Sequence, residues 1–185
     1  MAQTVRVPIR AEDYFQRPEY AERDSIELIG GEIVLPVPPT PQHQRIVREI
    51  LFWLTQLART QGGEALSAPV ELMLNDENVY QPDVLYLRPN SRCTVGEKRL
   101  TGAPDLVVEV LSPSTVKRDR QDKYFAYERH GVSEYWLVDP LYSVMECWVR
   151  GEESSGFRRL GVFSADESFF SPTLNAMVEV GAFLR

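Results

Sequence analysis

The most regular hydrophobic pattern in the chain lies in residues 42–60. Apolar positions recur there at helical spacing and form one broad stripe: Ile46, Val47, Ile50, Leu51, Trp53, Leu54 and Leu57. A stripe of this kind is typical of a helix that packs one face on a core. The pattern ends at Gly62-Gly63, which predicts the end of the helix.

A second helix is predicted for residues 115–129. Ser112, Pro113, Ser114 and Thr115 provide candidate cap residues and a proline close to the first turn. Gly131 follows and is expected to end the helix. A shorter helix, broken at Pro18 and followed by an irregular piece, is predicted within residues 11–24.

Short apolar runs bounded by turn-forming residues predict the strands of the first half. Residues 26–29 and 33–35 flank Gly30-Gly31 and predict a hairpin, because glycine tolerates the positive φ angles of a tight turn. The proline-rich segment 36–41 cannot continue a strand ladder and is expected to be a stiff connector. Residues 64–74 end in Asn-Asp-Glu-Asn, which predicts an antiparallel return into residues 80–87.

The second half reads as strand, helix and strand, followed by a hairpin. Residues 105–111 and the segment EYWLVDP flank the helix and predict a parallel crossover. Residues 145–149 and 157–163 predict a hairpin, and 174–184 a further strand or short helix. The order of elements predicts an α/β fold in which helices flank a mixed central β-sheet with added β-hairpins.

Length and composition indicate one ordinary globular domain. The chain has 185 residues, enough for a substantial core and short for two, so we expect a single domain over residues 1–185. The hydrophobic fraction is 43% and the charged fraction 25%, and no apolar run is long enough to cross a bilayer. The N-terminal segment MAQTVRVPIR lacks a secretory h-region, so a cytoplasmic location is expected. Cys93 and Cys147 form neither a disulfide framework nor a metal motif.

The net charge changes which partners are expected. It is −7, with a pI near 5.0, which argues against a protein that coats nucleic acid through a global positive field. Residues 117–130 locally reverse that sign, with five Lys or Arg against three acids. Either a local nucleic-acid contact or a solvated helix face explains this reversal.

Glu109 is the most informative polar residue, because it interrupts the apolar run of residues 105–111. Burying an unpaired carboxylate costs several kcal/mol, roughly, so this residue needs a cation, a set of hydrogen bonds or an exposed strand end. Metal-assisted hydrolysis of a phosphodiester requires two such acids and a nearby lysine. Mg²⁺ takes hard oxygen ligands and keeps several waters, so one or two carboxylates and a substrate phosphate suffice.

Distance selects the second acid. Asp105 shares a strand face with Glu109 by parity, but it lies four residues back, or about 13 Å along a strand. Asp83 begins the preceding strand and can lie opposite Glu109. Because Pro-Asp dipeptides are common at strand starts, spacing alone leaves a metal site and an ordinary strand start equally open.

The helix carries a third group of candidates. Asp119, Lys123 and Tyr127 are spaced four residues apart and share one side of the predicted helix. Lys123 is the residue type that orients a nucleophilic water or offsets charge in the transition state. An ordinary i,i+4 ion pair between Asp119 and Lys123 is the alternative, and would contribute a few tenths of a kcal/mol, roughly.

At these residues the chain resembles the Uma-two family of restriction-endonuclease-like domains, within the PD-(D/E)XK nuclease superfamily. The resemblance rests on PDLVVEVLSPST, the three helix residues, and GVSEYWLVDP, and continues upstream through AEDYF, IELIGGEIV, PQHQRIV and QPDVLYL. It covers roughly residues 11–140. It implies a restriction endonuclease-like core.

Residue by residue, the resemblance implies that Asp83 and Glu109 are the two metal-binding acids. The superfamily usually places its lysine two residues after the glutamate, where this chain has Leu111, and the resemblance points instead to Lys123 as the displaced catalytic lysine. Glu27 and His43 match recurring polar positions and are secondary candidates, as are Asp119 and Tyr127. His43 has an alternative reading as a surface or capping residue on the first helical turn.

Three functional hypotheses follow. The first is a Mg²⁺-dependent endonuclease, with Mn²⁺ able to substitute, acting on nucleic acid, with DNA favoured over RNA. The second is a binding or regulatory module that keeps the nuclease fold without turnover, and the third is a hydrolase of small phosphoesters. A homodimer is one expectation of the first hypothesis, because cutting both strands of a duplex often takes two active sites.

Overall fold

The computed structural model describes residues 8–17, 26–35, 37–151 and 156–184. Within these ranges the helical segments are α1 (Ala11–Gln16), α3 (Pro41–Gln61), α4 (Val116–Arg118), a π-helical turn (Asp119–Lys123), α5 (Tyr124–His130) and a 3-10 turn (Val180–Ala182). The predicted break at Pro18 and the irregular piece after it lie outside the described residues.

The strands form two six-stranded sheets and a separate hairpin. The first sheet has the order β2-β1-β5-β4-β8-β7, and its strands are β1 (Glu27–Ile29), β2 (Glu32–Val34), β4 (Leu72–Asn75), β5 (Asn78–Tyr80), β7 (Thr94–Val95) and β8 (Leu100–Thr101). The second has the order β12-β11-β10-β9-β6-β3, and its strands are β3 (Glu64–Ser67), β6 (Val84–Leu87), β9 (Leu106–Val110), β10 (Glu134–Asp139), β11 (Val144–Arg150) and β12 (Phe157–Ser164). The hairpin consists of β13 (Ser168–Ser171) and β14 (Ala176–Glu179).

Both sheets are mixed. In the first, β4 and β8 are parallel, and in the second β9 and β10 are parallel, whereas the other pairs are antiparallel. The parallel crossover predicted around the second helix is therefore confirmed. The predicted single central sheet is corrected to two sheets.

The segments predicted to form one hairpin are shared between the two sheets. β3 pairs with β6 in the second sheet, whereas β4 pairs with β5 in the first. Pro69 lies between β3 and β4 and Pro82 between β5 and β6. Because proline has no N–H to donate to a ladder, each position suits a chain that leaves one sheet for the other.

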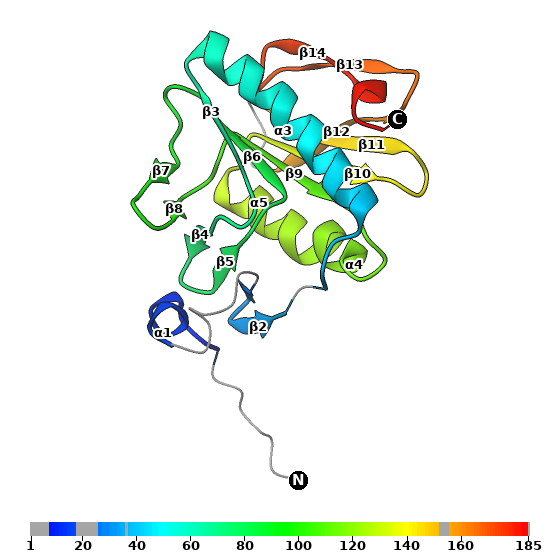
Figure 1. Cartoon of the computed structure of the whole chain (residues 1–185). Helices are drawn as coiled ribbons and strands as arrows, with labels where there is room; N and C mark the ends of the chain where they lie inside the picture. The colour runs from blue at the N-terminus through cyan, green and yellow to red at the C-terminus, as the bar shows by residue number, and fades with distance from the viewer. Residues whose placement is uncertain (1–7, 18–25, 36, 152–155, 185) are drawn as a thin grey trace.

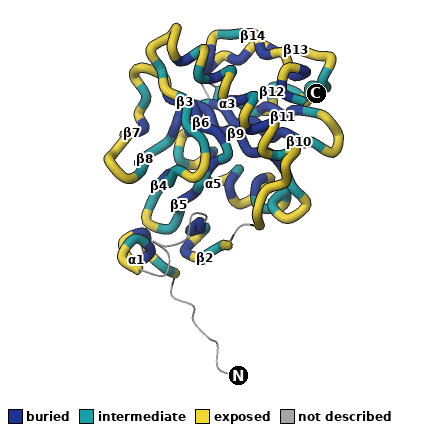
Figure 2. Tube along the Cα trace, viewed as in Figure 1, coloured by how far each residue is buried: buried dark blue, intermediate teal, exposed yellow. Residues whose placement is uncertain are grey.

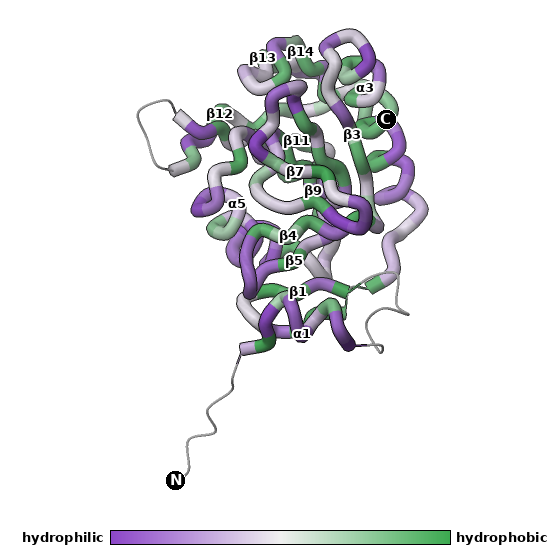
Figure 3. The backbone as a smooth tube through the Cα atoms, turned by 90° about the vertical axis from the view of Figure 1, so that its left-hand side faces the viewer, coloured by the Kyte–Doolittle hydropathy of each residue, from purple (hydrophilic) through white to green (hydrophobic). Residues whose placement is uncertain are grey.

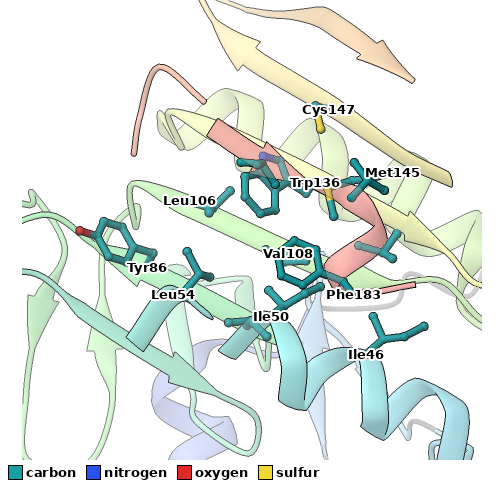
Figure 4. Close-up of a cluster of buried hydrophobic side chains, with 14 of the residues drawn as sticks. Ile46, Ile50, Leu54, Tyr86, Leu106, Val108, Trp136, Met145, Cys147 and Phe183 are labelled. Carbon is teal, nitrogen blue, oxygen red and sulfur yellow. The ribbon is translucent and has the colours of Figure 1, made fainter. Parts of the chain in front are cut away.

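Helix α3 follows the predicted stripe closely. It begins at Pro41 after Thr40, whose hydroxyl accepts a hydrogen bond from the His43 backbone N–H at 3.2 Å. It ends before Gly62, which has a φ of 77° in the left-handed region. Figure 4 shows its inward side chains Ile46, Ile50 and Leu54 packing toward β9 and β10.

The second sheet is covered on both faces. One face packs against α3 and the C-terminal hairpin, and the other packs against α5 and strands of the first sheet. Figure 1 shows α3 and α5 on opposite sides of β9 and β10. Helix α1 packs on β1 and β5 of the first sheet. Buried positions are concentrated in the central strands, where hydrophobic residues also gather (Figures 2 and 3).

Three smaller expectations have clear outcomes. The hairpin around Gly30-Gly31 and the one joining β11 to β12 are confirmed. The C-terminal segment contains both a strand, β14, and a short 3-10 turn, whereas the partner strand β13 was not predicted. Among the described residues, no helix is long and apolar enough to cross a membrane.

Candidate active site

Adjacent strands of the second sheet bring Asp83 close to the end of β9. β6 and β9 are antiparallel, with Val84 opposite Val108, so Asp83 at the start of β6 lies beside the end of β9 that carries Glu109. The Asp83 carboxylate oxygen Oδ2 accepts a hydrogen bond from the backbone N–H of Val110 at 2.7 Å. The register of the sheet therefore fixes where Asp83 lies, and the hydrogen bond from Val110 fixes its carboxylate.

Glu109 is buried, with 3% of its surface exposed. Its Oε1 atom accepts hydrogen bonds from Lys123 Nζ at 2.9 Å and from the Tyr127 hydroxyl at 2.8 Å. The cation and hydrogen bonds that the sequence required for this carboxylate thus come from the crossover helix, which consists of α4, the π-helical turn and α5 between β9 and β10.

Lys123 is the centre of a cluster of carboxylates. Its side chain is 5% exposed, and its Nζ lies 2.9 Å from Oε1 of both Glu109 and Glu27 and 3.8 Å from Oδ1 of Asp119. Glu27 comes from β1 in the first sheet, and its Oε1 also accepts the backbone N–H of Gln81 at 2.9 Å. The i,i+4 contact between Asp119 and Lys123 is therefore one part of a larger network.

Burial and charge shift the pKa values in this cluster. Burial raises the pKa of Glu109 well above its ordinary value, and the nearby Asp119 and Asp83 add to the rise that Lys123 opposes. Burial also raises the pKa of Asp119. For Lys123, burial lowers the pKa, but Glu109, Glu27 and Asp119 raise it by more, so the ammonium is strongly favoured.

The cluster therefore holds a surplus of negative charge. The carboxylates of Glu27, Glu109 and Asp119 surround one lysine, and Asp83 contributes a further charge nearby. An uncompensated buried charge is costly, so the site favours the uptake of a cation or a proton.

His43 lies on the first turn of α3 and its side chain points to Asp83. Its Nε2 is 3.2 Å from Asp83 Oδ2, and its side chain is 12% exposed, which disagrees with a surface role. Burial lowers the pKa of His43, but the hydrogen bond and charge of Asp83 outweigh it, so the pKa is raised. Asp83 thus favours the imidazolium form.

Asp105 and Leu111, which flank β9, lie outside the cluster's contacts. The Asp105 carboxylate accepts hydrogen bonds from the backbone N–H and the Nε of Arg88, at 2.9 and 2.7 Å. Leu111 is buried in the apolar cluster that also contains Tyr127. All seven candidate residues, in contrast, belong to one connected set of contacts or charges: Glu27, His43, Asp83, Glu109, Asp119, Lys123 and Tyr127.

The donor set fits a hard divalent cation through two carboxylates. Among the residues described, no group of three or more His, Cys, Asp or Glu side chains is arranged to hold a metal ion. Both contacts of Glu109 fall on Oε1 and both of Asp83 fall on Oδ2, so within the described chain the second oxygen of each receives no hydrogen bond. Mg²⁺ needs only one or two carboxylates when waters and substrate phosphate complete its coordination.

Two aromatic residues beside the cluster were not identified from the sequence. The Tyr80 ring centroid lies 5.8 Å from Lys123 Nζ, and the ring packs edge-on against Tyr127. The Tyr135 hydroxyl donates to the backbone carbonyl of Asp119 at 3.0 Å. Both sit in apolar strand patterns, where a tyrosine is indistinguishable from an ordinary core residue until its hydroxyl finds a partner.

The sequence matches the Uma2 family, described as "Putative restriction endonuclease", over residues 11–178. The chain belongs to the Uma2 family. The match includes every candidate residue and extends beyond the region on which the sequence resemblance rested.

Two known proteins resemble this Uma2 chain. The Synechocystis sp. protein sll1609, described as uncharacterized, is 28% identical over 137 residues, which cover 71% of this chain and 75% of that protein. The crystal structure of a "putative nuclease" of the DUF820 group from Anabaena variabilis superposes with a TM-score of 0.76. It covers 96% of this chain and 98% of its own at 19% identity, a likeness that establishes the mixed α/β fold alone.

Proposed function

We propose that this Uma2 chain is a Mg²⁺-dependent endonuclease that hydrolyses phosphodiester bonds of nucleic acid, with DNA favoured over RNA. The observation that carries the proposal is the position of Asp83 beside the end of β9 that carries Glu109, together with the contact of Glu109 with the buried Lys123. We further propose that β6, β9 and β10, with α3 and the crossover helix, form a restriction endonuclease-like core.

The chain's own residues have distinct roles in this proposal. Asp83 and Glu109 would hold the metal ion, for which Mn²⁺ would be able to substitute, and Lys123 provides positive charge next to Glu109. A bound divalent ion of this kind polarises phosphoryl oxygens and lowers the pKa of a coordinated water. Tyr127 fixes the Glu109 carboxylate through its hydroxyl, and His43 does the same for Asp83.

Isothermal titration of Mg²⁺ and Mn²⁺ tests the first step. We expect binding to the wild type that Asp83→Asn and Glu109→Gln both lose, because each change removes one anionic ligand. Asp105→Asn is the matched control, since Asp105 is a buried aspartate beside β9 whose carboxylate binds Arg88. The control should bind metal as the wild type does.

The titration is repeated with a non-cleavable oligonucleotide, because substrate phosphate completes many Mg²⁺ sites. Failure of metal to bind in both experiments, or equal binding to Glu109→Gln, would remove the basis of the nuclease proposal. Cleavage of DNA, RNA and short phosphoesters by the same variants then separates an endonuclease from a small-phosphoester hydrolase, whose rate would not rise with substrate length. The size of the complex on duplex DNA tests whether the chain acts as a homodimer.

A second candidate, an inactive binding module, is favoured by how completely Lys123 is enclosed. The lysine is 4% exposed and contacts three carboxylates, as expected for a purely structural ion network. A double-mutant cycle of Lys123→Met and Glu109→Gln measures that contribution. We expect Lys123→Met alone to lower the free energy of unfolding by about 3–5 kcal/mol, because it leaves buried carboxylates without their cation.

The cycle and the metal titration together separate the two candidates. A stable double variant with no metal binding in any protein supports the module. Metal binding by the wild type, lost in both acid variants, supports the nuclease. A Lys123→Met variant as stable as the wild type would contradict the structural role.

A further inference from the structure

The crossover helix is wider than an α-helix at the residues that carry the Asp119 and Lys123 side chains. Residues Asp119–Lys123 form a π-helical turn between α4 and α5, where the sequence predicted a continuous α-helix. Such turns are rare, and they occur frequently at functional sites. The turn begins at Asp119 and ends at Lys123, two members of the buried cluster.

The widened turn corrects a mismatch of helical geometry. In an α-helix of 3.6 residues per turn, positions four apart drift by about 40°, so Tyr127 would be about 80° from Asp119 around the axis. A wider turn takes up part of that rotation. Lys123 and Tyr127 accordingly both reach Oε1 of Glu109, while Asp119 stays within 3.8 Å of Lys123.

Two contacts from the second sheet hold the widened turn. The hydroxyl of Tyr135, a fully buried residue of β10, donates to the Asp119 carbonyl at 3.0 Å. Arg120, within the turn, pairs with the buried carboxylate of Glu146 on β11 at 2.5 Å. Because a π-turn interrupts the regular i→i+4 ladder, its carbonyls are open to donors of this kind.

We propose that Tyr135 is a positioning residue, whose hydroxyl holds the π-turn so that the lysine of the crossover helix reaches Glu109. The ion pair between Arg120 of the turn and Glu146 of β11 supports the same turn. The strand position two residues after Glu109 is Leu111, and the ammonium that contacts Glu109 comes instead from Lys123 at the end of the π-turn. The expected effect of this positioning on the rate of DNA cleavage rests on the proposed function, whereas the expected effect on the position of Lys123 does not.

The decisive comparison is between Tyr135→Phe and Tyr86→Phe in the full-length chain. Each change removes one hydroxyl from a fully buried tyrosine of the second sheet that bonds a helix, because the Tyr86 hydroxyl donates to Gln61 of α3. Tyr86 makes no contact with the lysine cluster in the described structure, so it controls for general loss of a buried hydrogen bond. Thermal unfolding of both variants establishes that each is folded.

The first readout is the side-chain ammonium signal of Lys123 in ¹H–¹⁵N NMR spectra, assigned with Lys123→Met. We expect Tyr135→Phe to shift or broaden this signal and Tyr86→Phe to leave it at its wild-type position. Glu146→Gln, which weakens the ion pair with Arg120, should shift the Lys123 signal in the same way as Tyr135→Phe. This readout needs neither metal nor substrate.

The second readout is the rate of Mg²⁺-dependent DNA cleavage. Misplacing a catalytic group by about 1 Å costs up to roughly 100-fold in rate, so Tyr135→Phe should lower kcat by about 10- to 100-fold with KM little changed. An unmoved lysine signal in Tyr135→Phe, or an equal shift in Tyr86→Phe, overturns the positioning role. If the Lys123 signal shifts in Tyr135→Phe but the wild type cleaves no substrate, the positioning role stands and the nuclease proposal is rejected.

Discussion

At the scale of single residues, burial and charge have opposing effects on the ionisation of the cluster around Lys123. Burial disfavours the ionised forms of Glu109, Asp119 and Lys123, yet the carboxylates keep Lys123 charged because they outnumber it. Asp83 differs from the deeper acids because its side chain is 20% exposed, so it lies at the more open side of the set. His43 pairs with this more open acid, so the protonation state of His43 responds to the pH of the solvent.

The pair of His43 and Asp83 predicts a pH-dependent contribution to stability. A histidine whose folded pKa is raised contributes stability that is fully present below its unfolded pKa of about 6.5 and is lost as pH rises through the folded pKa. In metal-free buffer, the difference in free energy of unfolding between wild type and His43→Gln should therefore be largest below about pH 6.5. Denaturant unfolding of both proteins across the pH range measures this difference. The contribution of His130 is present in both proteins and therefore cancels.

Asp83→Asn provides the control for this titration. Removal of the anionic partner should flatten the pH dependence in the same direction as His43→Gln does. A difference between wild type and His43→Gln that stays constant from acidic to alkaline pH would contradict the predicted pairing.

At the scale of elements, α3 and the crossover helix differ in what specifies them. α3 carries an uninterrupted apolar stripe with a threonine cap and a terminal glycine, so local signals predict it to within one or two residues. The crossover helix has the expected ends, but its π-turn depends on contacts from β10 and β11. Local propensity therefore places this helix without describing its inner geometry.

Packing of α3 on the second sheet predicts a sharp contrast between neighbouring faces of that helix. Leu54 has no exposed surface and Phe52 is 61% exposed. Leu54→Ala should lower the free energy of unfolding by about 2–5 kcal/mol, because it leaves a cavity against the sheet. Phe52→Ala should change it by no more than about 0.5 kcal/mol. Similar losses for both in denaturant unfolding would be inconsistent with this orientation of α3.

At the scale of the whole molecule, the cluster joins the two sheets. Glu27 belongs to β1 of the first sheet, Glu109 to β9 of the second, and Lys123 to the helix between β9 and β10. Glu27 also accepts a hydrogen bond from the backbone N–H of Gln81, which lies just before the chain enters the second sheet at β6. The charged network is thus also a connection between layers.

Amide hydrogen exchange tests this connection. Glu27→Ala should weaken protection at Leu28 and Val79, because it removes the anchor of β1 to Lys123 and to Gln81. Protection at Trp136 and Cys147, which pair within the second sheet, should stay at wild-type values. A uniform loss in both sheets would indicate global destabilisation and would argue against a local anchor.

The sequence alone determined most of the local elements and selected the candidate residues of the site. The stripe of α3, the glycine turns, and an acid inside the apolar run of β9 are encoded within a few residues of each position. Distance along a strand also separated Asp105 from Asp83, and the structure places Asp105 with Arg88. These signals depend on periodicity and chain geometry, which need no knowledge of distant partners.

Only the tertiary structure decided how the elements are shared and where the side chains meet. The tertiary structure decided that β4–β5 and β3–β6 belong to different sheets. The contacts of His43 with Asp83 and of Glu27 with Lys123 join residues separated by tens of positions. Long-range contacts of this kind are set by packing and by the burial of charge, which a sequence pattern does not contain. The π-turn follows the same rule, because the tyrosine that holds it lies on a strand beyond the helix.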